Sequence, residues 1–150
     1  MAIVTIIGAG MMGSALAFPA RENQNEVRLV GTHLDREIIE TCRATGRHPK
    51  FQKDFPAGVK YYQVEEMETA IEGADLIIGG VSSFGVDWFG DVVLPAIPEE
   101  IPVLTVTKGL MDTDDGRLLT YPEVWQRRLD AMGKKLSLNA IGGPSSPSSR

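Results

Sequence analysis

Three glycines near the N-terminus, Gly8, Gly10 and Gly13, follow the apolar, β-branched run 2–7 and precede small apolar residues with helical periodicity. A strand, a G-x-G-x-x-G turn and a helix in this order are typical of the loop that binds the phosphates of a dinucleotide. The first glycine permits a tight turn, the second lets a pyrophosphate approach the backbone, and the third lets the helix pack on the strand. The helix then offers unpaired N–H groups and the positive end of its dipole. The alternative is a glycine-rich turn that only connects two elements.

The residues after the second expected strand, 26–32, bear on the choice of dinucleotide. A domain specific for NAD places an Asp or Glu there, which binds the ribose 2′-hydroxyl. Here Thr32 and His33 occupy the tip, and the first acid, Asp35, comes slightly late. Without an acid to repel it, a 2′-phosphate could accept a hydrogen bond from Thr32, with His33 or Arg36 nearby. We favour Asp35 as the cap of the next helix over Asp35 as a ribose ligand. The cofactor is therefore NAD or NADP.

Further candidates follow later strands at their carboxyl ends, where open α/β sheets bind ligands. Ser82 and Ser83 follow the apolar run 74–81, and Lys108 follows the run 102–107. A lysine at such an edge would stabilise negative charge that develops on a carbonyl or phosphate. The alternative for Lys108 is a solvated loop lysine.

Two aromatic residues and one cysteine have structural alternatives. Phe84 and Trp88 could line the nicotinamide side of a cofactor, although aromatic residues at helical spacing are more often part of a core. Cys42, the single cysteine, lies in an expected helix without an obvious activating partner, which predicts a buried or inert thiol. The sequence predicts no metal site.

Strands and helices alternate along the chain and are expected to position these residues. The expected strands are residues 2–7, 26–32, 59–64, 74–81, 102–107 and 135–141. The expected helices are residues 11–23, with a kink at Pro19, and 35–45, 65–72, 84–97 and 122–132. The long excursion 47–58 and the polar stretch 111–117 are expected to be loops. The alternation predicts a doubly wound, mostly parallel Rossmann-type sheet in a three-layer α/β/α arrangement, with strand order 3-2-1-4-5-6.

Length and composition limit the classes of function that are possible. The chain has 150 residues, 43% of them hydrophobic, and a formal net charge of −5 without a long basic run. This argues against a general nucleic-acid binder. No apolar run is long enough to span a bilayer, and the single cysteine fits a reducing cytosol, so we expect a cytoplasmic protein. We expect one domain over residues 1–144 and a polar tail over residues 145–150, which we interpret as a remnant of truncation or cloning.

Four features together resemble the N-terminal coenzyme domain of soluble, nicotinamide-dependent glycerol-3-phosphate dehydrogenase. They are the Gly8–Ala17 loop and helix start, Glu26-Val-Arg-Leu on the second strand, Thr107-Lys108-Gly109-Leu110, and Gly142-Gly143-Pro144-Ser145. The excursion with Arg47-His48-Pro49 is similar to the family's loop after the second helix. The likeness runs through nearly the whole chain.

The resemblance implies reversible hydride transfer between NAD(P)H and dihydroxyacetone phosphate, which gives glycerol 3-phosphate. It implies that the pyrophosphate is held by Gly8, Gly10 and the amides of Met11, Met12 and Gly13. It also places His33 near the adenosine ribose and Ser83 and Phe84 against the cofactor. Lys108 would contact both cofactor and substrate as the catalytic candidate, and Gly143 and Ser145 would contact the substrate.

The chain departs from the family after Gly-Pro-Ser, where the family continues with a small residue and an acidic helix. We expect this chain to lack the family's C-terminal helical domain, with its general acid/base lysine, and therefore to show negligible turnover alone. Two alternatives stay open: another two-domain oxo-acid dehydrogenase, and a stand-alone nucleotide-sensing regulatory module. The oligomeric state also stays open between a monomer and a homodimer.

Overall fold

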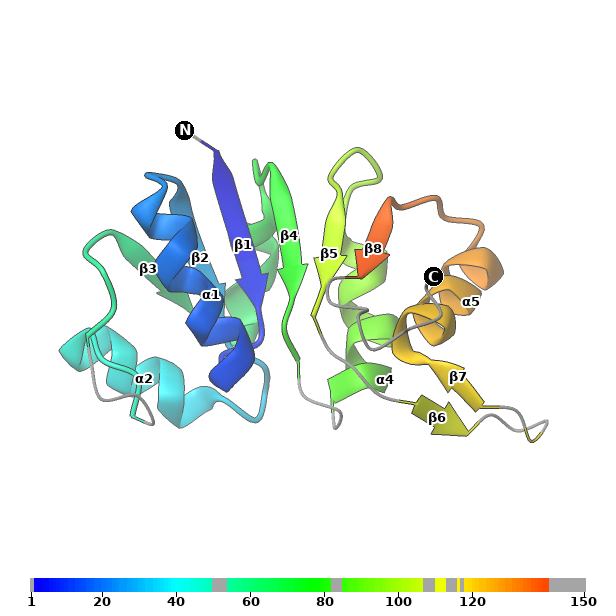
Figure 1. The fold of residues 1–150 in the computed structure, drawn as a ribbon, viewed down its shortest axis with the longest axis horizontal. Coiled ribbons are helices and arrows are strands. Elements are labelled where there is room, and N and C mark those ends of the chain that lie inside the picture. The colour runs from blue at the N-terminus through cyan, green and yellow to red at the C-terminus, as the bar shows by residue number, and fades with distance from the viewer. Residues whose placement is uncertain are drawn as a thin grey trace, which may run out of the picture.

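Six parallel strands of the computed structural model form one sheet in the order β3-β2-β1-β4-β5-β8 (Figure 1). They are β1 (Ile3–Ile7), β2 (Glu26–Val30), β3 (Val59–Tyr62), β4 (Leu76–Gly79), β5 (Val103–Thr105) and β8 (Leu138–Ala140). The predicted strand order is confirmed, with β8 as the sixth strand, and so is the doubly wound α/β class. The structure describes residues 2–49, 54–81, 85–106, 110–112, 116 and 118–140.

Helices cover both faces of this sheet. They are α1 (Met11–Glu22), α2 (Arg36–Thr45), α3 (Met67–Ile71), α4 (Val86–Trp88) and α5 (Tyr121–Met132). Successive strand residues point to opposite faces, so Ile6 and Ile7 belong to two different hydrophobic clusters. The cluster of Ile6 contains residues of α1 and α2, whereas that of Ile7 contains residues of α3, α4 and α5. Figure 1 shows α1 in front of the sheet and α4 behind it, which confirms the three layers.

Two of the predicted helices differ from the structure in internal detail. The described part of the predicted helix 84–97 changes from α4 to a π-helical segment, η3 (Phe89–Val93), and then to a 3-10 segment, η4 (Leu94–Ala96). Pro95 lacks the N–H that an α-helix would need at this position. The predicted helix 65–72 begins with a 3-10 turn, η1 (Val64–Glu66), before α3. Helix α1 continues through Pro19, while the predicted kink stays a prediction.

The predicted polar loop 111–117 is wrong at its first two residues, which belong to a strand, and a second strand that was not predicted begins directly after it. Strand β6 (Leu110–Asp112) pairs antiparallel with β7 (Leu118–Thr120) and forms a small second sheet. Each of these strands is only three residues long, which is too short for a period-two pattern to be recognised in the sequence.

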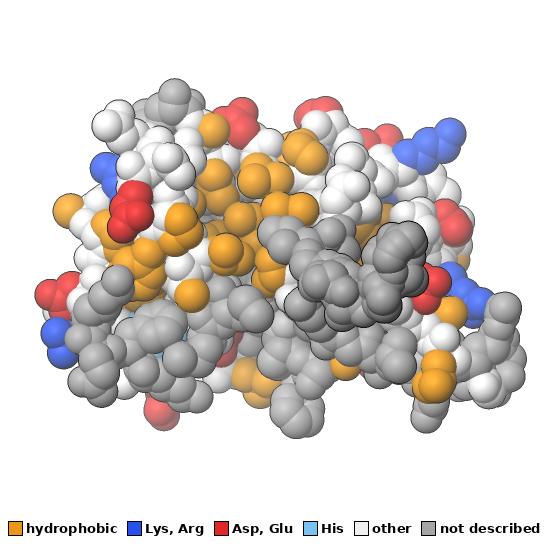
Figure 2. All heavy atoms as spheres, in the orientation of Figure 1, with side chains coloured by type: hydrophobic (Ala, Val, Ile, Leu, Met, Phe, Trp, Pro, Cys, Tyr) orange, Lys and Arg blue, Asp and Glu red, His pale blue; other side chains and the backbone are white. Residues whose placement is uncertain are grey.

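Helices α1 and α2 lie on one face of the sheet, and α4 and α5 lie on the other. The chain crosses the sheet in one direction from β1 and in the opposite direction from β4, and right-handed crossovers in opposite directions pass on opposite faces. Figure 1 accordingly shows no helix in front of β4, and hydrophobic side chains gather there beside α1 in Figure 2. The partly buried Leu76 and Leu104 pack against the cluster on this face. The strand order reverses between β1 and β4, which is where folds of this kind bind ligands.

Candidate functional site

The junction of β1 and α1 is packed too closely for side chains at two of the three glycines of the motif. Gly8 has a φ of 116°, and a Cβ placed on it would lie 2.6 Å from the carbonyl oxygen of Gly80, just after β4. A Cβ on Gly13 would lie 2.2 Å from the carbonyl oxygen of Gly8. A Cβ on Gly80 would lie 2.8 Å from the Cα of Gly13. The end of β1, the start of α1 and the end of β4 therefore meet backbone to backbone.

Gly10 differs from its two neighbours in the motif. It has a φ of −73°, which any residue can adopt, and a Cβ placed on it would have no atom within 4 Å. Gly10 is the N-cap of α1, and the first helical hydrogen bond runs from the N–H of Ser14 to its carbonyl. The amides of residues 11–13 precede that bond, and a helix leaves such groups for an outside acceptor. The residues that the structure describes thus impose no requirement for glycine at position 10.

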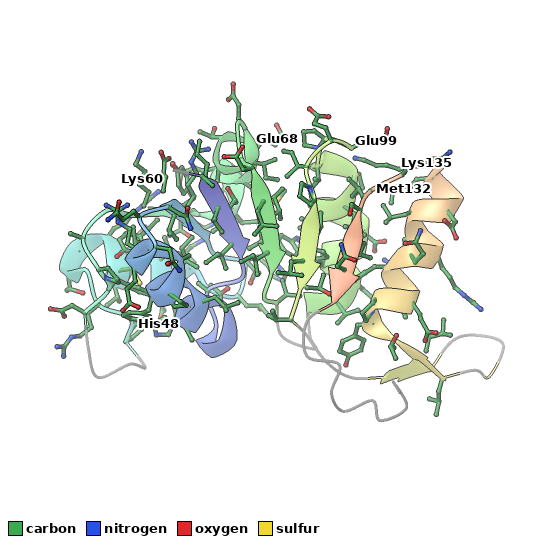
Figure 3. The ribbon with its side chains drawn as sticks, turned by 45° about the horizontal axis from the view of Figure 1, so that its top comes forward. His48, Lys60, Glu68, Glu99, Met132 and Lys135 are labelled. Carbon is green, nitrogen blue, oxygen red and sulfur yellow. The ribbon has the colours of Figure 1, made fainter. Side chains whose placement is uncertain are left out.

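The peptide groups of Ala9, between Gly8 and Gly10, are held by three side chains. Its N–H donates to Oδ2 of Asp35 over 3.0 Å. Its carbonyl accepts from Oγ of Ser14 over 3.1 Å and from Nε2 of His48 over 2.8 Å. Because a carbonyl can only accept, Nε2 of His48 carries the proton. Ala9, Ser14 and His48 are fully buried, and His48 lies near α1 and α2 in Figure 3.

Asp35 joins the glycine loop to the end of β2. Its Oδ2 accepts from the N–H of Thr32 over 3.0 Å and from the Thr32 hydroxyl over 3.2 Å, besides the bond from Ala9. The side chain makes no capping hydrogen bond to α2, although Asp35 occupies the N-cap position. The predicted side-chain cap is therefore wrong, because the carboxylate faces back toward β1 and β2. The Thr32 hydroxyl also accepts from the N–H of Leu34 over 3.1 Å, so its own hydrogen is already committed to Asp35.

A pocket lies where the β1, β2 and β4 ends meet. It is lined by Gly8, Gly10, Thr32, His33, Leu34, Asp35, Gly80, Val81 and Gly85. His33 is exposed, and its ring contacts that of Trp88 edge to face, with 6.0 Å between the centroids. Trp88 itself packs against the cluster of Ile7, which supports the core interpretation of this residue. The structure thus brings together Gly8, Gly10, Thr32 and His33 of the predicted site.

The other predicted site residues lie outside the described part of the chain. They are Ser83, Phe84, Lys108, Gly143 and Ser145. Met11 and Met12 are described as the first residues of α1, and their roles at the cofactor stay predictions. The close packing of Gly80 is not among the predictions, although the adjacent pair Gly79-Gly80 at a strand end could have indicated it. The roles of Ser14 and His48 at Ala9 are also not among them.

Cys42 is an unreactive thiol in this structure. It is 1% exposed, and burial raises its pKa to about 11, so it is protonated at neutral pH. This confirms the predicted buried thiol. Among the residues that the structure describes, none form a metal-binding group of three or more His, Cys, Asp or Glu. Within the same residues, no helix is long and apolar enough to cross a membrane.

A doubly wound sheet with a glycine loop at its switch point defines a dinucleotide-binding α/β domain. The family model described as the N-terminus of NAD-dependent glycerol-3-phosphate dehydrogenase matches residues 3–147. The chain therefore belongs to this family, as its N-terminal NAD(P)-binding domain.

Relatives and solved structures agree with this assignment. The NADP(+)-dependent glycerol-3-phosphate dehydrogenase of Archaeoglobus fulgidus is 39% identical over 143 residues, which are 95% of this chain and 41% of that protein. The NAD(P)+ glycerol-3-phosphate dehydrogenase of Myxococcus xanthus is 27% identical over 146 residues, 94% of this chain and 40% of that protein. The crystal structure of the Coxiella burnetii enzyme matches the fold with a TM-score of 0.70 at 21% identity, over 92% of this chain and 38% of that one. The chain spans less than half the length of these relatives.

Proposed function

We propose that this chain binds NAD or NADP across the Gly8–Gly13 loop and serves the reversible reduction of dihydroxyacetone phosphate to glycerol 3-phosphate. In this proposal the pyrophosphate lies over Gly10 and accepts hydrogen bonds from the amides of residues 11–13. Thr32 and His33 lie near the adenosine ribose, and Ser83 and Phe84 approach the cofactor from the end of β4. Lys108 contacts both cofactor and substrate, with Gly143 and Ser145 on the substrate side.

The observation that carries the proposal is the open space over Gly10. Gly8 and Gly13 are required by contacts within the protein, whereas a Cβ at position 10 would have no atom of the described residues within 4 Å. A glycine there makes sense when a ligand approaches the backbone closely. Gly10 lines the same pocket as Thr32 and His33, and the N-terminus of α1 adds a favourable dipole and the amides that precede its first helical hydrogen bond.

The first measurement is the thermal stability of the chain with NADH, with NADPH and with neither. A ligand that binds only the folded state stabilises it by about 2.7 kcal/mol at a hundredfold excess over its Kd. A rise in Tm with either cofactor supports the proposal, and the larger rise identifies the preferred one. No rise with either would contradict the proposal.

Gly10→Val tests where the cofactor binds. The added methyl groups would point into the open space and block the pyrophosphate, so we expect at least a tenfold loss of affinity, about 1.4 kcal/mol, in a protein that still folds. Ala44→Val adds similar bulk on an exposed position of α2 and serves as the control. An unchanged affinity in Gly10→Val would move the cofactor away from this loop.

A second titration separates the proposed substrate from the regulatory alternative. Dihydroxyacetone phosphate, added to the cofactor complex, should raise Tm further if the chain contributes to that substrate's site. A nucleotide-sensing module would respond to the dinucleotide only. A 2-oxo acid that raises Tm in place of the triose phosphate would instead favour the oxo-acid dehydrogenase alternative.

The proposal includes a cytoplasmic location. The single cysteine, Cys42, is a buried free thiol, which suits a reducing compartment. Sedimentation of the purified chain with and without cofactor distinguishes a monomer from a homodimer.

A further inference from the structure

The glycine loop depends on hydrogen bonds for its shape, because glycines flank Ala9 on both sides. Glycine has no side chain to restrict its backbone, so the chain at Gly8 and Gly10 has more conformational freedom than at other residues. Ala9 is buried and carries bonds at both its N–H and its carbonyl. These bonds come from α1, from the turn after β2 and from the segment after α2, so three separate parts of the fold fix one residue.

We infer that Asp35 is a positioning residue for the dinucleotide, which acts through Ala9 and does not bind the ribose itself. This inference rests on the proposed function, because it concerns the same cofactor site. By fixing the Ala9 N–H, Asp35 fixes the direction in which the chain enters Gly10 and α1. The amides of residues 11–13 are then aimed at one place before the cofactor arrives, which lowers the ordering cost of binding.

The bonds of Asp35 argue against a ribose ligand. Its Oδ2 accepts from three donors of the protein, at 3.0 Å from Ala9 N, 3.0 Å from Thr32 N and 3.2 Å from Thr32 Oγ1. An acid that selects NAD directs its oxygen toward the 2′-hydroxyl and repels a 2′-phosphate. Asp35 directs Oδ2 into the fold instead. Its loss should therefore weaken NADH and NADPH binding by the same factor.

Asp75 provides a matched control at the other end of β1. Its Oδ2 accepts from the N–H of Ile3 over 2.8 Å, so it makes the same kind of carboxylate–backbone bond. Asp75 precedes β4, at the amino ends of the strands, whereas the cofactor pocket lies at their carboxyl ends. Asp75→Ala should lower Tm and leave both affinities unchanged.

The experiment measures Tm and the Kd values for NADH and NADPH in the 150-residue chain and in D35A, D35N and D75A. D35A leaves the buried N–H of Ala9 without its partner, and we expect both Kd values to rise by about tenfold or more. D35N keeps an oxygen acceptor and loses only the charge. We expect D35N to stay within about threefold of the unsubstituted chain for both cofactors. The ratio of the two Kd values should be the same in every variant.

Each other outcome overturns a definite part of this inference. A selective loss of NADH binding in D35N, or a selective gain of NADPH binding, would make Asp35 a ribose ligand. If D35A binds NADH and NADPH with unchanged affinity, Asp35 is a purely structural residue like Asp75. If D35A does not fold, D35N decides, because only a ribose ligand changes the ratio of the two Kd values. If the unsubstituted chain binds neither cofactor, the proposed function fails before any variant is compared, and the inference fails with it.

Discussion

The two ends of β1 are fixed in different ways. At the amino end, Asp75 holds the N–H of Ile3, and toward that end, at mid-strand, the Thr5 hydroxyl donates to the carbonyl of Ala70 in α3 over 2.6 Å. At the carboxyl end, side chains hold Ala9, and Gly8 meets the backbone after β4. In Figure 3, Glu68, Glu99 and Lys135 lie along the edge opposite the one where His48 lies.

This difference separates contacts that stabilise the fold from contacts that also shape a site. The described contacts at the amino end join β1 and β2 to α3, and the proposed function places no ligand there. At the carboxyl end a similar set of contacts surrounds one open position, Gly10. Substitutions at the amino end should change stability alone. At the carboxyl end, some substitutions should change mainly stability and others mainly cofactor binding, depending on the residue.

The largest expected effect comes from Gly13→Ala. The new Cβ would lie 2.2 Å from the Gly8 carbonyl oxygen, a backbone atom that cannot rotate away. We expect a loss of about 3 kcal/mol or more in the free energy of unfolding. Gly10→Ala adds the same methyl group in open space and should cost under about 1 kcal/mol, since it changes only the N-cap. Urea unfolding of both variants measures the difference, and equal losses would contradict the proposed distinction within the loop.

A smaller effect is expected from Arg28→Met at the amino end. Nη1 of Arg28 donates to the carbonyls of Ala70 and Glu72 over 3.2 Å and 2.6 Å, and Nε donates to Glu26 over 2.8 Å. The side chain is 15% exposed, so its loss leaves acceptors partly shielded from water. We expect a loss of about 2 kcal/mol in stability, with no change in cofactor affinity.

Arg36→Met is the control for the stability part of that prediction. Arg36 pairs with Glu65 at the surface, where the side chains are 50% and 61% exposed. Such a pair contributes about 0–1 kcal/mol. If Arg28→Met weakened cofactor binding more than it lowered stability, the two ends of β1 would not be independent.

The sequence predicted the sheet because its signals are strong and local. Apolar runs such as 2–7 and 74–81 can be buried on both faces only in a parallel sheet covered by helices. The glycine spacing then fixed the position of the loop. The strand order followed from the alternation of strands and helices together with the handedness of their connections.

The features that were predicted wrongly or not predicted depend on contacts between residues that are far apart in the sequence. Asp35 stands where a helix cap is expected, but Ala9, 26 residues away along the chain, supplies a donor for its carboxylate. Nothing in the local pattern around Asp35 indicates that donor. The role of His48 is similar, because its partner, the carbonyl of Ala9, is 39 residues away. Backbone partners have no sequence signature, so contacts of this kind emerge only in the folded chain.

The smallest expected effect is the pH dependence of stability at the amino end. The hydrogen bond from Arg28 lowers the pKa of Glu26 below its usual value, with Lys60 contributing and burial opposing. A carboxyl group with a lowered pKa in the folded state stabilises the protein above its unfolded pKa of about 4.3 and loses that contribution as pH falls through the folded value. Unfolding of Glu26→Gln, compared with the unsubstituted chain at pH 7 and pH 3, should show a loss of under about 1 kcal/mol at pH 7 that is smaller at pH 3. An equal loss of stability at pH 7 and pH 3 would mean that Glu26 acts through packing. If cofactor affinity changed with pH in parallel with the protonation of Glu26, the two ends of β1 would be coupled.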